Sequence, residues 1–192
     1  MAKVQFIKKS RKEFRCKKCG AVIPVGSSYY RGEINFGPTI IRCSKCKLES
    51  WEVTTSDYQL RAGEILYKWA ETYGVSEDTV QSVSDDLQSL CDDLQEKLDN
   101  MPEGLQEGDI GQLLQERIDN IDSAISELDC IDIDEIKSDV MSELFDTDAD
   151  YDESLEKFRA CKDGEEKVTN IENTFKEKVT EAIEEALSSI EI

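Results

Sequence analysis

Beyond residue 57 the chain places apolar residues every three or four positions, with polar and acidic residues between them. This period is typical of helices that bury one face. It predicts a first helix over 57–73, with Ser56 as its N-cap and Gly74 directly after its end. The apolar residues on or near one side of this helix are Leu60, Ile65, Leu66 and Trp69.

Two narrow apolar stripes follow the first helix. The first begins after a helix start at 76–79 and comprises Val80, Val83, Leu87, Leu90, Leu94, Leu98 and Met101. The second comprises Ile110, Leu114, Ile118, Ile121, Ile125 and Leu128. The segment 102–108 interrupts them, so the pattern predicts an antiparallel helical hairpin within 57–131. The same seam equally allows two copies of the chain to associate into a homo-oligomer.

The apolar pattern weakens over 132–151, where we expect an acidic linker. The segment 146–152 begins like a calcium-binding loop, but Tyr151 and Lys157 stand where such a loop requires glycine and glutamate. The pattern returns over 152–192, which predicts further helices separated near Gly164. These helices could pack on the hairpin or bind a partner. Their apolar stripe comprises Leu155, Phe158, Val168, Ile171, Phe175, Val179, Ile183 and Leu187.

The first 56 residues have a different pattern, in which β-prone runs alternate with turn signals. Runs at 29–36 and 39–42 are separated by the turn-forming pair Gly37-Pro38, which predicts a β-hairpin. Few of these residues are large and apolar, so a module of about 50 residues could hardly fold on its own core. A further source of stability is needed.

Four cysteines in this segment could supply that stability by binding a metal ion. They form two Cys-x-x-Cys pairs, at 16–19 and 43–46, with 23 residues between the pairs. Two intervening residues let one tight turn aim both sulfurs at a single ion, and two such turns supply the four thiolates of a closed tetrahedral zinc site. We therefore predict that one structural Zn²⁺ is held by Cys16, Cys19, Cys43 and Cys46.

The alternatives to zinc are less consistent with the sequence. Disulfides would need an oxidising compartment, and a redox Cys-x-x-Cys would stand singly at the start of a helix. The remaining thiols, Cys91, Cys130 and Cys161, stand singly and are expected to be small buried side chains. The predicted fold class is thus a small β zinc-ribbon module over 1–56, followed by an all-α region with a helical hairpin or coiled-coil-like bundle.

The cysteine module also has a resemblance to known proteins. The segments 16–26, 29–32, 37–38 and 41–46 resemble zinc ribbons in uncharacterised tailed-bacteriophage proteins, which are similar in carrying an acidic helical region afterwards. The Ile-Pro-x-Gly turn at 23–26 also resembles the zinc finger of poly(ADP-ribose) polymerases, which recognises DNA breaks and usually has His where Cys43 stands. The resemblance covers about residues 1–60 and implies a zinc module on a non-enzymatic protein in the cytoplasm of a phage-infected bacterium.

Charge divides the chain near residues 54–57. Residues 1–56 have a net charge of +8 and residues 57–192 a net charge of −28, within a total of −20. The basic module suggests a surface for nucleic acid or another partner, with Phe36 as a further ring for base stacking. The same cations could instead stabilise the thiolates, the rings could fill a small core, or the acidic region could mask the basic one. The residues predicted to contact a partner are Arg15, Lys17, Lys18, Tyr29, Tyr30, Arg31, Arg42 and Lys45.

Composition excludes several functions. The chain has no His, which removes Ser-His-Asp and Cys-His catalysis, and the predicted zinc site has no open position for a catalytic water. No apolar run reaches the length of a membrane span, so we expect a soluble, cytoplasmic protein without membrane contact. The leading hypothesis is a non-enzymatic interaction protein with a host or phage protein as partner. The alternatives are an acidic DNA-mimic inhibitor of a host nucleic-acid-binding or defence enzyme, and a nucleic-acid-binding zinc ribbon.

Overall fold

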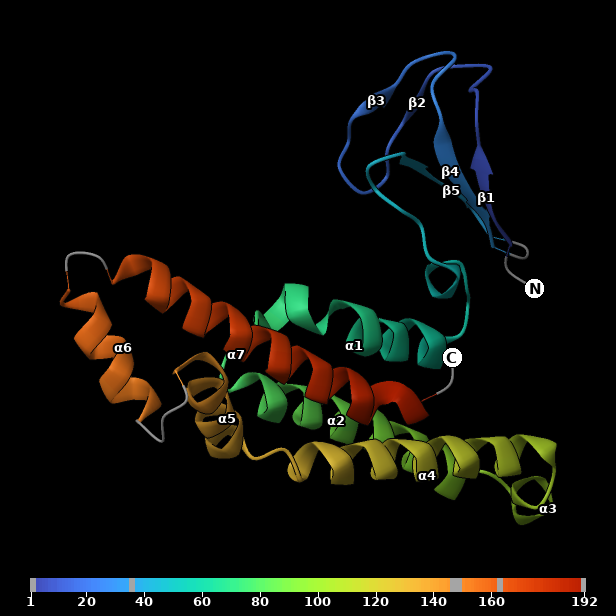
Figure 1. Cartoon of the computed structure of the whole chain (residues 1–192). Helices are drawn as coiled ribbons and strands as arrows, with labels where there is room; N and C mark the ends of the chain where they lie inside the picture. Colours follow the sequence, from blue (N-terminus) through green and yellow to red (C-terminus); the bar gives the residue numbers. More distant parts are fainter. Residues whose placement is uncertain (1–2, 35–36, 146–149, 162–163, 191–192) are drawn as a thin grey trace. The chain divides into compact units, whose positions relative to one another are not determined.

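The computed structural model describes residues 3–34, 37–145, 150–161 and 164–190 (Figure 1). The chain forms two compact units, of which the first extends to Glu64 and the second begins at Ile65. We call them the β unit and the helical unit. Their division falls inside helix α1 (Asp57–Tyr73), later in the chain than the change in charge at 54–57.

Two small antiparallel sheets make up the β unit. Strands β1 (Lys3–Ile7), β4 (Tyr29–Glu33) and β5 (Thr39–Cys43) form one sheet in the order β1-β4-β5. Strands β2 (Phe14–Arg15) and β3 (Val22–Ile23) form the other. The predicted hairpin between β4 and β5 is confirmed, whereas β1 was not predicted because its partner β4 lies far along the chain.

A second group of buried side chains extends the β unit past its sheets. The 3-10 helix η1 (Ser50–Glu52) follows β5, and Val53 packs close to Gly32 of β4, where an added Cβ would lie 2.6 Å from the Val53 side chain. Gly63 of α1 lies against the indole of Trp51, with its Cβ position 2.3 Å from the ring. Only glycine allows these approaches. The first turns of α1 therefore belong to the β unit.

The helical unit contains the rest of α1 and six further helices in the part of the chain that the structure describes (Figure 1). The predicted α1 is confirmed with the same bounds, and Gly74 ends it with a φ of 72°. The predicted fold class, a small β module followed by an all-α region, is confirmed. The helices after α1 are α2 (Thr79–Asp99), α3 (Glu103–Gln106), α4 (Asp109–Asp129), α5 (Ile133–Phe145), α6 (Tyr151–Arg159) and α7 (Glu165–Ala186), followed by the 3-10 helix η2 (Leu187–Ser189).

The hairpin predicted from the two apolar stripes is formed by α2 and α4, which lie side by side with the single turn α3 between them in sequence (Figure 1). Leu87 and Leu94 of α2 and Ile121 and Leu128 of α4 are completely buried. Helix α7 then packs against α4 and α5, and it buries Val179. Of the two arrangements that the sequence left open for the C-terminal helices, docking on the hairpin is the one found.

One prediction in this region was wrong. The segment 132–151, expected to be an acidic linker, contains helix α5, whose Val140 and Met141 are buried. The sequence pattern was weak because only a short stripe of this helix faces the core. Residues 146–149 of the calcium-like segment lie outside the described residues. No helix in the described part of the chain combines the length and the apolar character needed to cross a membrane.

Candidate metal centre

The first Cys-x-x-Cys turn joins β2 to β3. The backbone N–H of Gly20 donates to the carbonyl oxygen of Cys16 at 2.9 Å, and the N–H of Cys16 donates to the carbonyl of Ala21 at 2.9 Å. Gly20 has a φ of 71°, in the left-handed region that favours glycine. The turn is therefore closed by local hydrogen bonds and by one glycine, which explains why the sequence signal was strong.

The second turn directly follows β5. There the N–H of Cys46 donates to the carbonyl of Cys43 at 2.9 Å. The first turn is hydrogen-bonded to β5, the strand that leads into the second turn: the N–H of Lys17 donates to the carbonyl of Ile41 at 2.8 Å. A backbone bond between residues that are 24 positions apart in the chain thus brings the two cysteine pairs to one place.

The four sulfurs form one cluster. The Sγ atoms of Cys16, Cys19, Cys43 and Cys46 all lie within 4.8 Å of one another, and the Sγ atoms of Cys19 and Cys43 are 3.8 Å apart. A tetrahedron of sulfurs around zinc, with bonds of about 2.3 Å, has edges of about 3.8 Å. Among the described residues, these four side chains are the group of His, Cys, Asp or Glu close enough together to share an ion. The cluster could hold one metal ion.

A small apolar core lies directly beneath the cluster. Cys16 and Ile23 are almost completely buried, and the ring of Tyr29 lies 5.1 Å from the ring of Phe14, measured between centroids. Ile41, Cys43 and Cys46 pack against this group. Three of the four cysteines are therefore part of this core, while Cys19 is exposed, so a change in the geometry of the sulfurs would disturb the packing of the β unit.

The electrostatics of the cluster favour a bound cation. Burial raises the pKa of the Cys16 thiol, but backbone hydrogen bonds from Cys19, Cys43 and Lys18 outweigh it and lower that pKa to about 6. Side-chain hydrogen bonds that the Cys46 thiol donates toward Cys19 and Cys43, together with burial, raise the pKa of Cys46 to about 12. The sulfurs are thus too close for all four to become thiolates without compensation. A divalent ion at their centre supplies that compensation.

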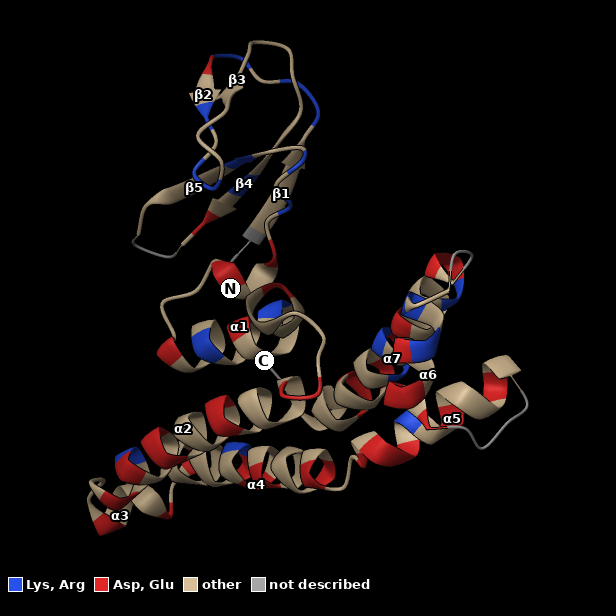
Figure 2. Cartoon of the chain, turned by 90° about the vertical axis from the view of Figure 1, so that its left-hand side faces the viewer, with Lys and Arg blue, Asp and Glu red and all other residues tan. Residues whose placement is uncertain are grey.

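The structure separates the residues that were predicted to contact a partner. Arg15, Lys17, Lys18 and Lys45 are exposed on β2 and on the two cysteine turns. Arg31 is partly exposed and forms an ion pair with Glu33. Figure 2 shows Lys and Arg on the strands and loops of the β unit, and Asp and Glu along the helices.

Arg42 has a partner inside the β unit. Its side chain is 14% exposed and donates two hydrogen bonds of 2.7 Å to the carboxylate of Glu52, which is 9% exposed. A further bond of 3.0 Å goes to the carbonyl of Lys47. Glu52 was not predicted as the partner of Arg42, although its position three residues after Glu49 is the spacing of a capping box. Arg42 therefore holds the second cysteine turn against η1.

The predicted stacking rings have different surroundings. Tyr29 is 7% exposed and belongs to the core under the cluster, so its ring faces the protein interior. Tyr30 is partly exposed, and its ring lies 5.0 Å from that of the exposed Phe6 across the sheet, measured between centroids. Phe36 lies outside the described residues. Of the two roles considered for these rings, base stacking and filling a small core, Tyr29 therefore has the second.

The three single cysteines were expected to be buried, and this is wrong for two of them. Cys91 is buried between α2 and α4, where its thiol donates a bond of 3.2 Å to a carboxylate oxygen of Asp122. Cys130 and Cys161 are exposed, because each lies just after the end of a helix rather than on its apolar face. A spacing pattern does not distinguish these two situations.

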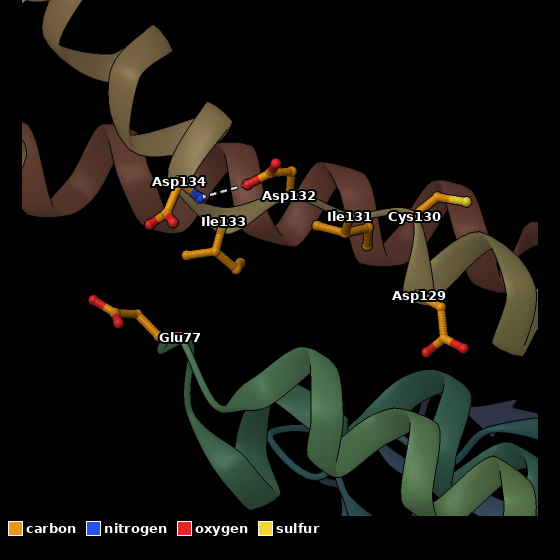
Figure 3. Close-up of a pocket in the computed structure, with 7 residues that line it drawn as sticks. All are labelled: Glu77, Asp129, Cys130, Ile131, Asp132, Ile133 and Asp134. Carbon is orange, nitrogen blue, oxygen red and sulfur yellow. Dashed lines mark hydrogen bonds between the residues drawn. The ribbon is translucent and has the colours of Figure 1, made fainter.

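A pocket of about 470 Å³ in the helical unit is lined by Cys130 and by four acidic residues, Glu77, Asp129, Asp132 and Asp134 (Figure 3). Two of its carboxylates have structural roles. Asp132 accepts a bond of 2.9 Å from the backbone N–H of Asp134 at the start of α5, and Glu77 pairs with Lys137 at 2.8 Å. Among the described residues, the acidic side chains of this pocket do not form a group close enough together to share an ion.

Comparison of the chain with protein-family models, with curated proteins and with solved structures finds no match in any of the three. The chain itself has a four-cysteine cluster in a small β unit, followed by packed helices.

Proposed function

We propose that this protein is a non-enzymatic, zinc-dependent interaction protein, in which one Zn²⁺ bound by Cys16, Cys19, Cys43 and Cys46 gives the β unit its shape. The observation that carries the proposal is the convergence of four sulfurs within 4.8 Å, with one separation of 3.8 Å. Four thiolates in tetrahedral positions favour zinc over harder cations such as magnesium or calcium. All four coordination positions are filled by protein, as in structural zinc sites.

The acidic helical unit serves in this proposal as a scaffold that binds a protein of the host cell or of a phage. Its helices are packed on one another, and Asp and Glu recur along them (Figure 2), none of them buried among the described residues. Charge of this density keeps a scaffold soluble and steers basic partners toward it. The phage-infected cell that the N-terminal resemblance implies is the setting in which a partner should be sought.

The zinc proposal is tested by metal analysis of reduced protein, purified without added metal. We expect one equivalent of zinc per chain by plasma mass spectrometry. Replacement of zinc by Co²⁺ should give the intense near-ultraviolet bands of cobalt thiolates and the visible bands of a tetrahedral site. Cys43→Ser should abolish stoichiometric binding, while Cys161→Ser, at an exposed cysteine outside the cluster, should leave it unchanged. Iron in place of zinc, or less than a tenth of an equivalent of any metal, would refute the zinc assignment.

A second function for the β unit is supported by the exposed cations. Arg15, Lys17, Lys18 and Lys45 surround the cysteine turns and are free of the buried contacts that engage Arg42. They would bind phosphate groups of a nucleic acid without reading its sequence. Neutralising all four should remove DNA binding at low salt without loss of zinc, whereas neutralising Lys157, Arg159, Lys167 and Lys176 in the helical unit should not.

Fluorescence anisotropy with a short DNA duplex, repeated over a range of salt concentrations, measures this function. Binding through about four phosphate contacts should weaken steeply as salt rises. Equal affinities of the two neutralised variants and the unaltered chain would exclude the four residues as a nucleic-acid surface.

A further inference from the structure

Apolar side chains are exposed at the tip of the helical hairpin, whereas along the rest of the hairpin such side chains are buried between the helices. Leu105 on α3 is 56% exposed, and Ile110 and Leu113 on α4 are 64% and 44% exposed. Ile110 and Leu113 are one helical turn apart on the same side of α4, and α3 packs against α4. We call these three residues, with the turn that holds them, the hairpin tip. Exposed apolar residues gathered on two packed helices differ from single ones, which are normal.

The tip is held in one conformation. The side-chain amide of Gln106 donates to the carbonyls of Leu98 at 3.1 Å and of Met101 at 2.8 Å, which fastens α3 to the end of α2. On the other side, Gly111 is buried so close to the backbone of Gln106 that an added Cβ would lie 2.0 Å from its carbonyl oxygen. These contacts place α3 firmly on α4. The two helices that carry the three apolar side chains are therefore held in a fixed arrangement, which lowers the entropic cost of binding.

The charge around the tip specifies its partner. Between Lys97 and Arg117 there is no Lys or Arg, and all five acidic residues of that interval are exposed. These five are Asp99, Glu103, Glu107, Asp109 and Glu116. An apolar patch bordered by one sign of charge attracts the opposite sign and repels its own. A second hairpin tip is thus disfavoured as the occupant.

We infer that the hairpin tip is a docking surface for an amphipathic helical segment of another protein, with apolar residues on one face and Lys or Arg flanking them. The apolar face of that segment covers Leu105, Ile110 and Leu113, and its cations meet the carboxylates around them. The inference goes beyond the proposed zinc centre. It names where the helical unit binds and is independent of the metal.

The test uses the full zinc-loaded chain and a synthetic helical peptide of about 14 residues, made of Leu and Lys in an amphipathic arrangement. A peptide of the same composition, with its leucines distributed around all faces, is the control for charge alone. Titration calorimetry measures affinity, and amide shifts in nuclear magnetic resonance spectra locate the bound peptide. We expect the amphipathic peptide to bind more tightly than its isomer and to shift residues 101–114.

The decisive variant is Ile110→Ser combined with Leu113→Ser. Both side chains are exposed, so the fold and the zinc content should be retained while affinity for the amphipathic peptide falls about tenfold or more. Val25→Ser, at a β-unit position that is 65% exposed, is the matched control and should change nothing. Glu103→Gln with Glu107→Gln should reduce affinity more than Glu181→Gln with Glu184→Gln on α7.

Equal loss in the tip and control variants, or equal binding of the two peptides, would overturn the inference, because binding would then follow net charge alone. A concentration-dependent dimer that disappears with Ile110→Ser and Leu113→Ser would also overturn it and assign the tip to a second copy of this chain. A chain without metal, but with tip-dependent binding of the peptide, would refute the zinc proposal and leave this inference standing.

Discussion

The β unit has a small buried cluster at its cysteine turns, made of Cys16, Ile23 and Tyr29. In the helical unit, by contrast, α2 and α4 share a continuous seam of fully buried leucine and isoleucine. The first unit carries a positive charge in its first 56 residues, and the helices carry most of the negative charge. The two units therefore illustrate two sources of stability. A helix pair is held by apolar area along its length, while a module with little apolar area needs a covalent or metal crosslink.

The largest expected effect follows from removal of one of the proposed metal ligands or of the metal itself. Cys43→Ser, or a strong chelator added to the reduced protein, should unfold the β unit and leave the helices intact. Structural zinc contributes about 10–16 kcal/mol of apparent binding free energy in small modules, which is as large as the whole stability of a typical domain. Amide shift dispersion for residues 3–43 should collapse while helical ellipticity at 222 nm is retained. Retention of that dispersion would show that the β unit folds without metal.

A cavity in the helical seam should destabilise the helical unit and leave the β unit unchanged. Leu94 is completely buried, so Leu94→Ala should destabilise the helical unit by about 2–5 kcal/mol through lost burial and an incompletely filled cavity. The zinc content should not change. The control is Leu113→Ala, at an exposed position, which should lie within about 0.5 kcal/mol of the unaltered chain in urea unfolding followed by ellipticity. A similar loss of unfolding free energy in both variants would show that the seam is not the main source of stability.

Within the β unit, breaking the partly buried ion pair between Arg42 and Glu52 should have a smaller effect. Glu52→Gln removes the charge that Arg42 meets through two bonds of 2.7 Å, so the zinc-loaded β unit should lose about 1–3 kcal/mol. The exposed pair between Lys47 and Glu49 is the comparison, and Lys47→Gln should cost less than Glu52→Gln. Urea unfolding monitored through the amide signals of β4 and β5 measures both. A larger loss from Lys47→Gln would reverse the ranking.

The smallest effect concerns the reactivity of single thiols. Burial, and then the hydrogen bond to Asp122, raise the pKa of Cys91 to about 12. At pH 8, iodoacetamide should modify the exposed Cys130 and Cys161 within minutes and leave Cys91 unmodified in mass spectra. Above pH 9 the unfolded chain loses this thiol proton and the folded chain keeps it. The free energy of unfolding therefore falls as pH rises from about 9 toward 12, because the folded chain holds a proton on Cys91 that the unfolded chain has lost.

Agreement between prediction and structure is best where the signal is local. The bounds of α1, the two cysteine turns and the β4–β5 hairpin were predicted because each depends on residues close together in sequence, such as Gly20 after Cys19 and Gly74 after Tyr73. Helix α5 was missed because it buries mainly Val140 and Met141, and a stripe this short is indistinguishable from a linker in an acidic segment.

The amino-acid sequence by itself determined that four sulfurs are spaced for one ion and that the helices carry apolar seams, because spacing and periodicity are properties of neighbouring residues. Only the tertiary structure decided which side chains remain available to a partner. Arg42 is held by Glu52, Tyr29 lies in the core, and Leu105 and Ile110 are exposed at the hairpin tip. These outcomes depend on contacts between residues brought together by folding, and exposure to solvent is set by such contacts rather than by residue type.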